Sequence, residues 1–246
     1  MNSSLPDSLI PTNDAERLQA LAPYLVLGPA PDAVFDEVVR LTAKLFDVPI
    51  ALVSLVEEGS VWFKANFGLP DGGGSGRVDR DQSICSVAIL QDAPIVFEDL
   101  RREPCRLTRP DVAEALDMRF YAASPLRNAA GYAIGALCVI GREPRQLGAP
   151  EQARLQDLAG VVMKLLDLRL ALHRQPEQAG AVWRQLYDQL DHSLVRLDTL
   201  AALAGYEDSP DTAAARQYGI SREEEADLVT RLLDAQVTAA LAMVAG

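Results

Sequence analysis

The segment RDQSICSVAIL, residues 80–90, contains a cysteine at a position where it could do chemistry. Polar residues that favour a helix start precede it and apolar residues follow, so Cys85 is expected in the first turn of a short helix. The positive end of a helix dipole stabilises a thiolate and lowers the pKa of a thiol. Cys85 is therefore a candidate catalyst, a candidate attachment point for a cofactor, or a small apolar side chain that fills a core.

Composition narrows the class of protein. The chain has 246 residues, of which 49% are hydrophobic and 24% charged, so it can form one large domain or a domain with an appendage. A formal net charge of −12 disfavours nucleic acid and anionic membrane as partners. Cys85, Cys105 and Cys138 are far apart and never form a CxxC pair, which argues against a disulfide framework or a zinc site and fits a reducing compartment.

The N-terminal region carries no recognisable targeting signal. No basic residue precedes Arg17 and no long apolar run is present, so a signal peptide is not expected. The most apolar stretches are shorter than the roughly 20 residues that span a bilayer. We expect a cytoplasmic protein whose residues 1–12 are a flexible N-terminus.

Hydrophobic periodicity in the first part of the chain predicts two helices and then a β-hairpin. The expected helices cover 13–22 and 31–46, and the expected strands cover 49–56 and 61–68. The second strand alternates, and the residues expected on one of its faces are Val61, Phe63, Ala65 and Phe67. Residues 69–80 are expected to be a flexible loop, because their glycines lack the Lys-Ser/Thr pair of a phosphate loop.

The middle of the chain predicts a second group of strands and a long helix. The order is a strand at 94–100, a short helix with Thr108 and Asp111 at capping-box spacing, a hairpin of strands 119–126 and 132–141, and a helix over 150–173. Strands joined by short turns imply a mostly antiparallel sheet, and the helices suffice to cover both of its faces. The predicted fold class is α+β, with a pocket on the side of the small helices.

Several segments, in this order, resemble the GAF domain found ahead of bacterial histidine kinases and diguanylate cyclases. The residues that carry the resemblance, between 13 and 172, include Phe46-Asp47-Val48-Pro49, Trp62-Phe63-Lys64-Ala65, Ser83-Ile84-Cys85-Ser86 and Arg119-Phe120-Tyr121-Ala122-Ala123-Ser124-Pro125-Leu126. The resemblance implies a GAF domain over 13–174 that is a sensory or dimerising module. Such domains bind very different small molecules or none.

The expected pocket contains candidate ligand-binding residues but no catalytic set. The candidates are Cys85, Phe97, Asp99, Arg119, Tyr121 and Ser124. The charged members could instead pair at the surface, and Phe97 and Tyr121 could instead fill the core. With His173 and His192 as the only histidines, no metal site is expected.

Two GAF subfamilies use cysteines for chemistry. Photoreceptors attach a bilin to a cysteine in the region of Cys105, usually followed by histidine; Arg106 follows here, so we expect no bilin and a colourless protein. Free methionine sulfoxide reductases place cysteines in positions similar to Cys85 and Cys105, but Ser86 replaces a glycine of that family. A thiol reductase is therefore the alternative to a non-catalytic module, and Cys138 is expected to be core.

Residues 175–246 predict a helical hairpin. Trp183, Leu190 and Leu197 recur every seven residues in a helix over 177–204. A polar loop and a last helix over 221–245, capped by Ser221, are expected to follow. These stripes cannot be buried by the hairpin alone, so they must pack on the GAF body or on a second copy. We expect a homodimer held by the helices over 150–174, 177–204 and 221–245, and the alternative is a hairpin that folds back on its own GAF domain.

The hairpin also resembles in outline the dimerisation hairpin of histidine kinases. Within that resemblance, His192 occupies the first helix, which makes a degenerate histidine phosphotransfer protein a further alternative. A signalling protein is a possible partner, and a small molecule a possible ligand.

Overall fold

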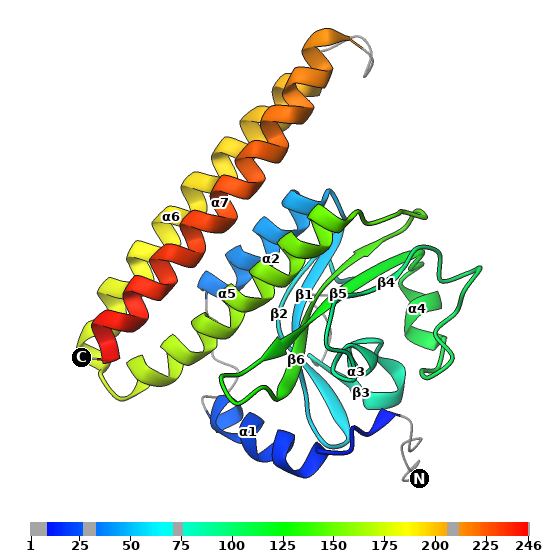
Figure 1. Cartoon of the computed structure of the whole chain (residues 1–246), viewed down its shortest axis with the longest axis vertical. Coiled ribbons are helices and arrows are strands. Elements are labelled where there is room, and N and C mark those ends of the chain that lie inside the picture. Colours follow the sequence, from blue (N-terminus) through cyan, green and yellow to red (C-terminus); the bar gives the residue numbers. More distant parts are fainter. Residues whose placement is uncertain (1–8, 27–32, 71–75, 206–211, 246) are drawn as a thin grey trace.

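A computed structural model describes residues 9–26, 33–70, 76–205 and 212–245 of the chain. These residues form one sheet with the strand order β3-β2-β1-β6-β5-β4, in which every neighbouring pair is antiparallel. The strands are β1 Ile50–Val56, β2 Ser60–Phe67, β3 Arg77–Asp79, β4 Ile95–Phe97, β5 Phe120–Arg127 and β6 Ala133–Gly141. Figure 1 shows helices on both faces of this sheet, which confirms the predicted α+β fold class.

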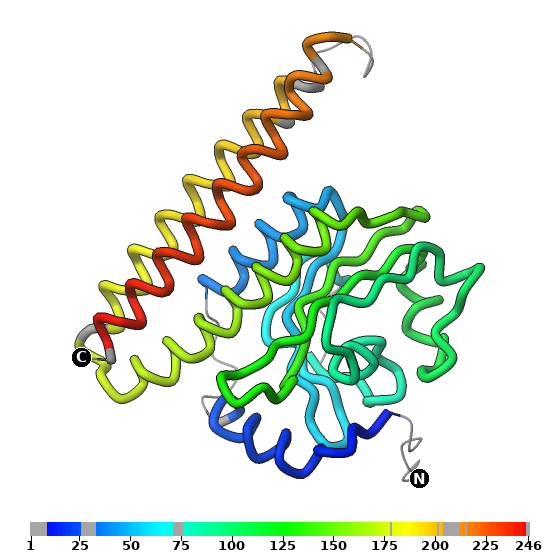
Figure 2. The backbone as a smooth tube through the Cα atoms, in the orientation of Figure 1, coloured from blue at the N-terminus to red at the C-terminus, as the bar shows by residue number. Residues whose placement is uncertain are grey.

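The helices form separate layers. They are α1 Asp14–Val26, α2 Ala33–Phe46, α3 Cys85–Ala88, α4 Asp111–Ala115, α5 Ala149–His173, α6 Pro176–Gly205 and α7 Ala213–Ala245. The long helices α2 and α5 cover one face of the sheet, the short helices α3 and α4 lie on the other, and α6 and α7 pack on the outer side of α2 and α5 (Figures 1 and 2). None of the helices in the described residues is both long enough and apolar enough to cross a bilayer.

Alternation along the central strands divides the core into two clusters. On the side of α2 and α5 lie Val53, Leu55, Phe120, Leu137 and Val139, which are fully buried. On the side of α3 and α4 lie Leu52, Tyr121, Ala136, Cys138 and Ile140. Neighbouring residues of one strand therefore belong to different clusters, so the sheet mechanically joins its two faces.

A β-bulge changes which residues of β2 share a face. Val53 pairs with Ala65 and Ser54 pairs with Phe63, so Lys64 is an extra residue in β2. Ala65 therefore lies on the side of α2 and α5, whereas Phe63 lies on the side of α3. The prediction that Phe63 and Ala65 share a face was wrong for this reason.

Three local expectations also require correction. The expected loop over 69–80 contains the edge strand β3, which pairs with β2; residues 71–75 lie outside the described residues. Helix α4 begins after Pro110 without a side-chain cap, so Thr108 does not cap it. Helix α7 begins at Ala213, and Ser221 lies inside it instead of capping it, because the alanines before it favour helix strongly.

A buried cluster of charged groups joins the N-terminal region to the hairpin of β1 and β2. Arg80 is 0% exposed and donates to the Leu9 carbonyl oxygen at 2.9 Å and to the Asp14 carboxylate at 3.1 and 3.2 Å. Arg80 also donates to the Glu58 carbonyl oxygen, at 3.3 Å. Arg17 donates to Asp14 at 2.7 Å. Burial alone would raise the pKa of Asp14, but the hydrogen bonds from Arg80 and Arg17 hold it below its ordinary value.

The helices α6 and α7 are packed on α2 and α5 of the same chain. The buried apolar residues of this seam are Leu186, Leu190, Leu194 and Leu197 of α6 and Val229, Leu233 and Val237 of α7. Most ion pairs across it place the cation on α2 or α5 and the carboxylate on α6 or α7; the pair of Arg222 with Asp47, at 3.7 Å, has the opposite sense. Arg154 pairs with Glu223 and Asp227 at 2.8 and 2.9 Å, Lys164 pairs with Asp234 at 2.6 Å, and Lys44 pairs with Asp198.

The expected dimer was to bury the apolar stripes of these helices, but packing within one chain already buries them. Leu190 and Leu197 are already buried within one chain, so a second copy is not needed to cover them. The homodimer stays a prediction. The large apolar residues that face outward on these helices are Tyr187, Val195, Leu203, Ile220, Leu232 and Met243.

Leu190 and Val195 therefore make a matched pair of variants. Leu190 is 1% exposed and Val195 is 58% exposed. Leu190→Glu buries an unpaired charge and is expected to lower the free energy of unfolding by about 3–5 kcal/mol. Val195→Glu is expected to change it by no more than about 0.5 kcal/mol. Urea denaturation measures both values.

Light scattering at micromolar concentration completes this test. If α6 packs inside its own chain, Leu190→Glu leaves the mass of the native protein unchanged. A native Leu190→Glu protein of undiminished stability and half the wild-type mass would contradict the intramolecular seam.

The Arg80 cluster generates a second prediction. Arg80→Met leaves the largely buried Asp14 carboxylate with Arg17 alone and removes the donor to the Leu9 and Glu58 carbonyl oxygens, so we expect the free energy of unfolding to fall by about 3–5 kcal/mol. Arg77 lies three residues away, is half exposed and pairs with Glu57, so Arg77→Met is expected to cost no more than about 1 kcal/mol. Thermal and urea denaturation of both variants provide the comparison, and equal losses would argue against the cluster as an anchor.

The pH dependence of this effect has a defined sign. The pKa of Asp14 is depressed in the folded state, so its contribution to stability is present above its unfolded pKa of about 4. That contribution is lost as the pH falls below this value. The stability difference between wild type and Asp14→Asn should therefore be constant near neutral pH and shrink below about pH 4.

Candidate ligand-binding site

A cavity of about 280 Å³, here called the inner cavity, lies between the sheet and the short helices. Its floor consists of side chains of β1, β2, β5 and β6, and its walls come from β3, α3 and α4. Most of the lining is apolar, and the apolar members include Leu52, Phe63, Leu69, Val78, Val112, Leu116, Met118 and Ile140. The polar members of the lining are Gln82, Ser83, Cys85, Asp111, Tyr121 and Cys138.

Helix α4 covers the inner cavity with little buried surface of its own. None of its five residues is buried, in contrast to every residue of α3. The loop before α4 is attached to the turn before α3, because the Arg109 amide donates to the Asp81 carbonyl oxygen at 2.7 Å and the Arg109 guanidinium pairs with the Asp81 carboxylate at 2.9 Å. Because α4 buries little surface while the loop before it is held in place, opening of α4 requires less free energy than movement of any other wall of this cavity.

Cys85 lies at the centre of a buried hydrogen-bonding group. Its side chain is on the first residue of α3, as predicted, and it is 3% exposed. The Tyr121 hydroxyl donates to Cys85 Sγ at 3.4 Å, and Cys138 Sγ lies 4.0 Å from Cys85 Sγ. The Cys85 amide donates to Ser83 Oγ at 3.3 Å, which fixes the start of α3.

These partners decide which sulfur carries charge. Hydrogen bonding with Cys138, and then with Ser54, Tyr121 and Ser83, outweighs burial and lowers the pKa of Cys85 to about 6. Burial raises the pKa of Cys138 and the pKa of Tyr121 well above their ordinary values. The expected helix dipole contributes little, because α3 spans only four residues. Of the two thiols, Cys85 is therefore the one that ionises more readily.

The structure separates the other predicted site residues. Phe97 lies beside Tyr121, with ring centroids 6.3 Å apart and planes at 60°. Asp99 and Arg119 bind each other through two hydrogen bonds of 2.7 Å, and this contact lowers the pKa of Asp99 to about 2. Neither Asp99 nor Arg119 lines the inner cavity. The two residues therefore form a structural ion pair, which was the alternative to ligand binding.

Ser124 lies on the opposite face of the sheet from Tyr121. It pairs with Leu137, whose side chain belongs to the cluster on the side of α2 and α5. Its hydroxyl oxygen is buried and has no hydrogen-bond partner among the described residues. The expectation that Ser124 shares a pocket with Tyr121 is therefore corrected by strand alternation, which puts residues three apart on opposite faces.

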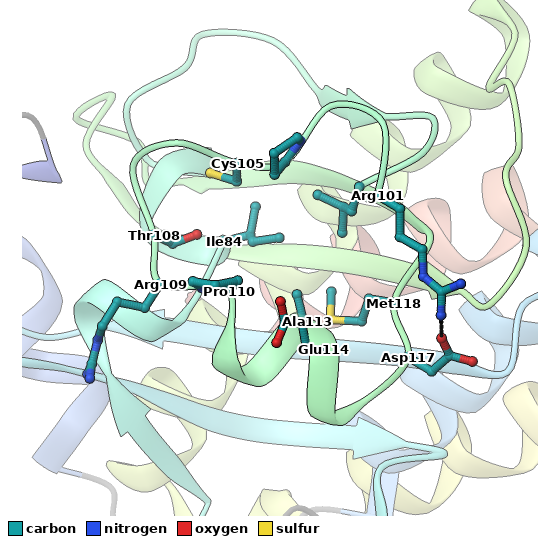
Figure 3. Close-up of a pocket in the computed structure, with 12 residues that line it drawn as sticks. Ile84, Arg101, Cys105, Thr108, Arg109, Pro110, Ala113, Glu114, Asp117 and Met118 are labelled. Carbon is teal, nitrogen blue, oxygen red and sulfur yellow. Dashed lines mark hydrogen bonds and ion pairs between the residues drawn. The ribbon is translucent and has the colours of Figure 1, made fainter.

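A second cavity, here called the outer cavity, has a volume of about 540 Å³ and lies between α4 and the loop before it (Figure 3). Ile84, Ala113 and Met118 line both cavities, so they form the wall between them. Arg101 lies at its rim and pairs with Asp117 at 2.5 Å, as the dashed line in Figure 3 marks. Cys105 lines the outer cavity and Cys85 the inner one, so the structure does not bring the two expected reductase cysteines to one site.

Sequence reasoning missed Cys138, Ser54 and Ser83 as members of the candidate site. Cys138 was assigned to the core because it lies in the middle of an apolar strand. Its position on the same face as Tyr121 depends on the register of β5 and β6, which pairs Ala123 with Cys138. Within the described residues, no three histidine, cysteine or acidic side chains gather in a way that could hold a metal ion.

Comparison with known proteins agrees with the fold. Residues 30–166 match the GAF domain family, which is more than half of the chain, so this chain belongs to the GAF domain family. Over 164 residues it is 34% identical to a cyclic di-GMP phosphodiesterase of Pseudomonas aeruginosa, a match that covers 66% of this chain and 27% of that protein.

Solved structures with similar folds include a methionine sulfoxide reductase and a GAF domain that absorbs blue light. The type II free methionine-R-sulfoxide reductase of Thermoplasma acidophilum is 16% identical, with a TM-score of 0.42, over 52% of this chain and 84% of that one. The blue-light absorbing form of the PixJ GAF domain of Thermosynechococcus elongatus is 16% identical, with a TM-score of 0.47, over 61% of this chain and 90% of that one.

The geometry around Cys85 predicts an unusual titration. In a Cys105→Ser background, the rate of reaction with a small uncharged thiol reagent, methyl methanethiosulfonate, is expected to rise with pH about a midpoint near 6, following the pKa of Cys85. Tyr121→Phe removes a donor to the thiolate and is expected to move the midpoint upward. Cys85→Ser removes the fast phase and serves as the control. A midpoint near the ordinary thiol pKa of about 8.5 would contradict this assignment.

Proposed function

We propose that this GAF domain is a sensory module that binds a small, mostly apolar ligand in the inner cavity and relays its presence to the α6–α7 hairpin. The observation that carries the proposal is the inner cavity itself, which is apolar and has a few convergent polar groups on its floor. Cavities with this combination are the usual sites for small molecules, and a volume of about 280 Å³ suits a small ligand.

The relay is supported by the way the sheet joins its two sides. Leu52, Tyr121 and Cys138 lie at the floor of the inner cavity, and their neighbours Val53, Ala122 and Val139 pack on the side of α2 and α5. Helices α2 and α5 in turn contact α6 and α7 through the apolar seam and the ion pairs across it. A ligand that favours one arrangement of the floor therefore acts on the seam through packed side chains.

The similarity to a cyclic di-GMP phosphodiesterase supports a regulatory role in a signalling protein of that kind. We propose that the chain regulates such an output instead of carrying out catalysis itself. Homodimerisation belongs to this proposal as well, with the outward apolar residues of α6 and α7 as the contacting surface.

A thiol reductase acting on free methionine sulfoxide is the second candidate, because the lowered pKa of Cys85 favours thiol chemistry. Cys105 lines the other cavity, which leaves that reaction without the expected second thiol on the same site. Thioredoxin-dependent turnover of free methionine sulfoxide that disappears in Cys85→Ser would favour the reductase over the sensory module.

Two tryptophan variants on α4 test ligand binding. Val112 lines only the inner cavity and Glu114 lines only the outer one, so each substitution fills one cavity on the same helix. Native mass spectrometry of protein purified from cells is expected to show a small molecule bound to the wild type and to Glu114→Trp, but at least tenfold less bound to Val112→Trp. Retention by Val112→Trp would overturn the proposal. So would the absence of any bound molecule from the wild type together with no binding of the amphiphilic dye anilinonaphthalene sulfonate.

A further inference from the structure

The inner cavity contains two thiols that the sensory role does not use. Cys85 lies on α3 and Cys138 on the central strand β6, 53 residues apart in the chain, and their sulfurs are 4.0 Å apart. Both are free and both line the inner cavity. Cys105 lines the outer cavity and is more exposed than either, yet it lacks a second thiol on the same cavity.

We propose that Cys85 and Cys138 form a peroxide-reactive dithiol, which a small uncharged hydroperoxide oxidises to a disulfide after entering the inner cavity. The proposal deepens the proposed function, because it adds a means of regulating the same cavity, and its effect on ligand binding depends on that function. The thiol chemistry itself depends only on the two sulfurs and their surroundings.

The first step assigns Cys85 as the nucleophile. Tyr121 donates to its sulfur at 3.4 Å, and the Ser83 and Ser54 hydroxyls also lie in this group. Its sulfur forms a bond to one peroxide oxygen and the oxygen–oxygen bond breaks. The other oxygen leaves as an alcohol, or as water from hydrogen peroxide, with the proton that the Cys85 thiol gave up. Cys85 is then a sulfenic acid, and the two electrons that its sulfur has lost have reduced the peroxide.

The second step assigns Cys138 as the resolving thiol. Its sulfur attacks Cys85 Sγ, the sulfur–sulfur bond forms, and the sulfur–oxygen bond breaks. The hydroxyl leaves as water with the Cys138 proton, so two thiols and one hydroperoxide give one disulfide, one alcohol and one water. The sulfurs must approach by about 2 Å to reach bonding distance, and the change falls on α3, because Cys138 is held in the middle of the sheet.

The surroundings select the oxidant. The wall between the cavities and the rest of the lining are mostly apolar, which favours a neutral hydroperoxide over a charged oxidant. The same enclosure keeps large thiols such as glutathione from the Cys85 sulfenic acid, which leaves Cys138 as the partner within reach. Closure of the disulfide ties α3 to β6 and changes the floor on which a ligand rests.

The experiment uses the whole chain with hydrogen peroxide and with tert-butyl hydroperoxide. Peptide mass spectrometry without reduction is expected to find the Cys85–Cys138 cross-link in the wild type and in Cys105→Ser. In Cys138→Ser the reaction is expected to stop at the first step, and dimedone should label Cys85. Tyr121→Phe is expected to slow formation of the cross-link about threefold or more, because its thiolate is less stabilised.

Two outcomes would overturn the dithiol. One is oxidation of Cys105 ahead of Cys85 in the wild type; the other is complete oxidation of Cys85 to sulfinic acid with no cross-link to Cys138. The wild-type measurement needs no variant to fold, so a misfolded substitution cannot decide the result.

Failure of the proposed function is recognised separately. Reduced protein that carries no ligand but forms the cross-link contradicts the sensory pocket and supports the dithiol. Reduced protein that retains its ligand but forms no cross-link supports the sensory pocket and contradicts the dithiol. If both hold, the cross-linked protein is expected to retain at least tenfold less of the co-purified molecule than the reduced protein.

Discussion

The position of the candidate site depends on one buried guanidinium. Arg80 is taken entirely out of water, which is tolerated only because the Asp14 carboxylate and several carbonyl oxygens surround it. The same residue accepts a hydrogen bond from the Ser86 hydroxyl through its own carbonyl oxygen, at 2.7 Å, and so holds the start of α3. The N-terminal helix, the turn of the β1–β2 hairpin and the start of α3 with Cys85 are thus fixed by one side chain and its backbone.

The inner cavity combines two properties that usually exclude each other. Its lining is apolar enough to accept a small uncharged molecule, yet the hydroxyls and thiols on its floor support a charge on Cys85. A low dielectric strengthens each of these hydrogen bonds and makes an unpaired charge costly, so the charge state and the packing of the floor are coupled. Ligand binding and thiol oxidation would both act on the same few side chains.

Much of the fold follows from local patterns in the sequence, whereas the membership of the site does not. Helices, hairpins and the antiparallel sheet follow from periodicity and short turns. One extra residue at Lys64 changes which side chains of β2 face α2, and nothing in the alternation of that strand reveals it. The pairing of β5 with β6 decides that Cys138 shares a face with Tyr121, whereas alternation along β5 alone puts Ser124 on the other face. Each register is set by the turn that joins the two strands and by the packing of both faces, which the alternation of a single strand does not contain.

The α6–α7 hairpin extends beyond the two helices that carry it (Figure 1). Helix α7 contains 33 residues, so at about 1.5 Å per residue it is about 50 Å long. At one end Gln175 holds the Val244 carbonyl oxygen at 3.1 Å, and at the other the helix continues past Arg222, which donates to the Lys44 carbonyl oxygen. The hairpin is therefore a lever, and for an arm of this length a rotation of about 5° at the Gln175 end displaces the far end by about 4 Å. A rearrangement in the sheet that is too small to alter a distant surface directly becomes, at that end, a displacement as large as a side chain.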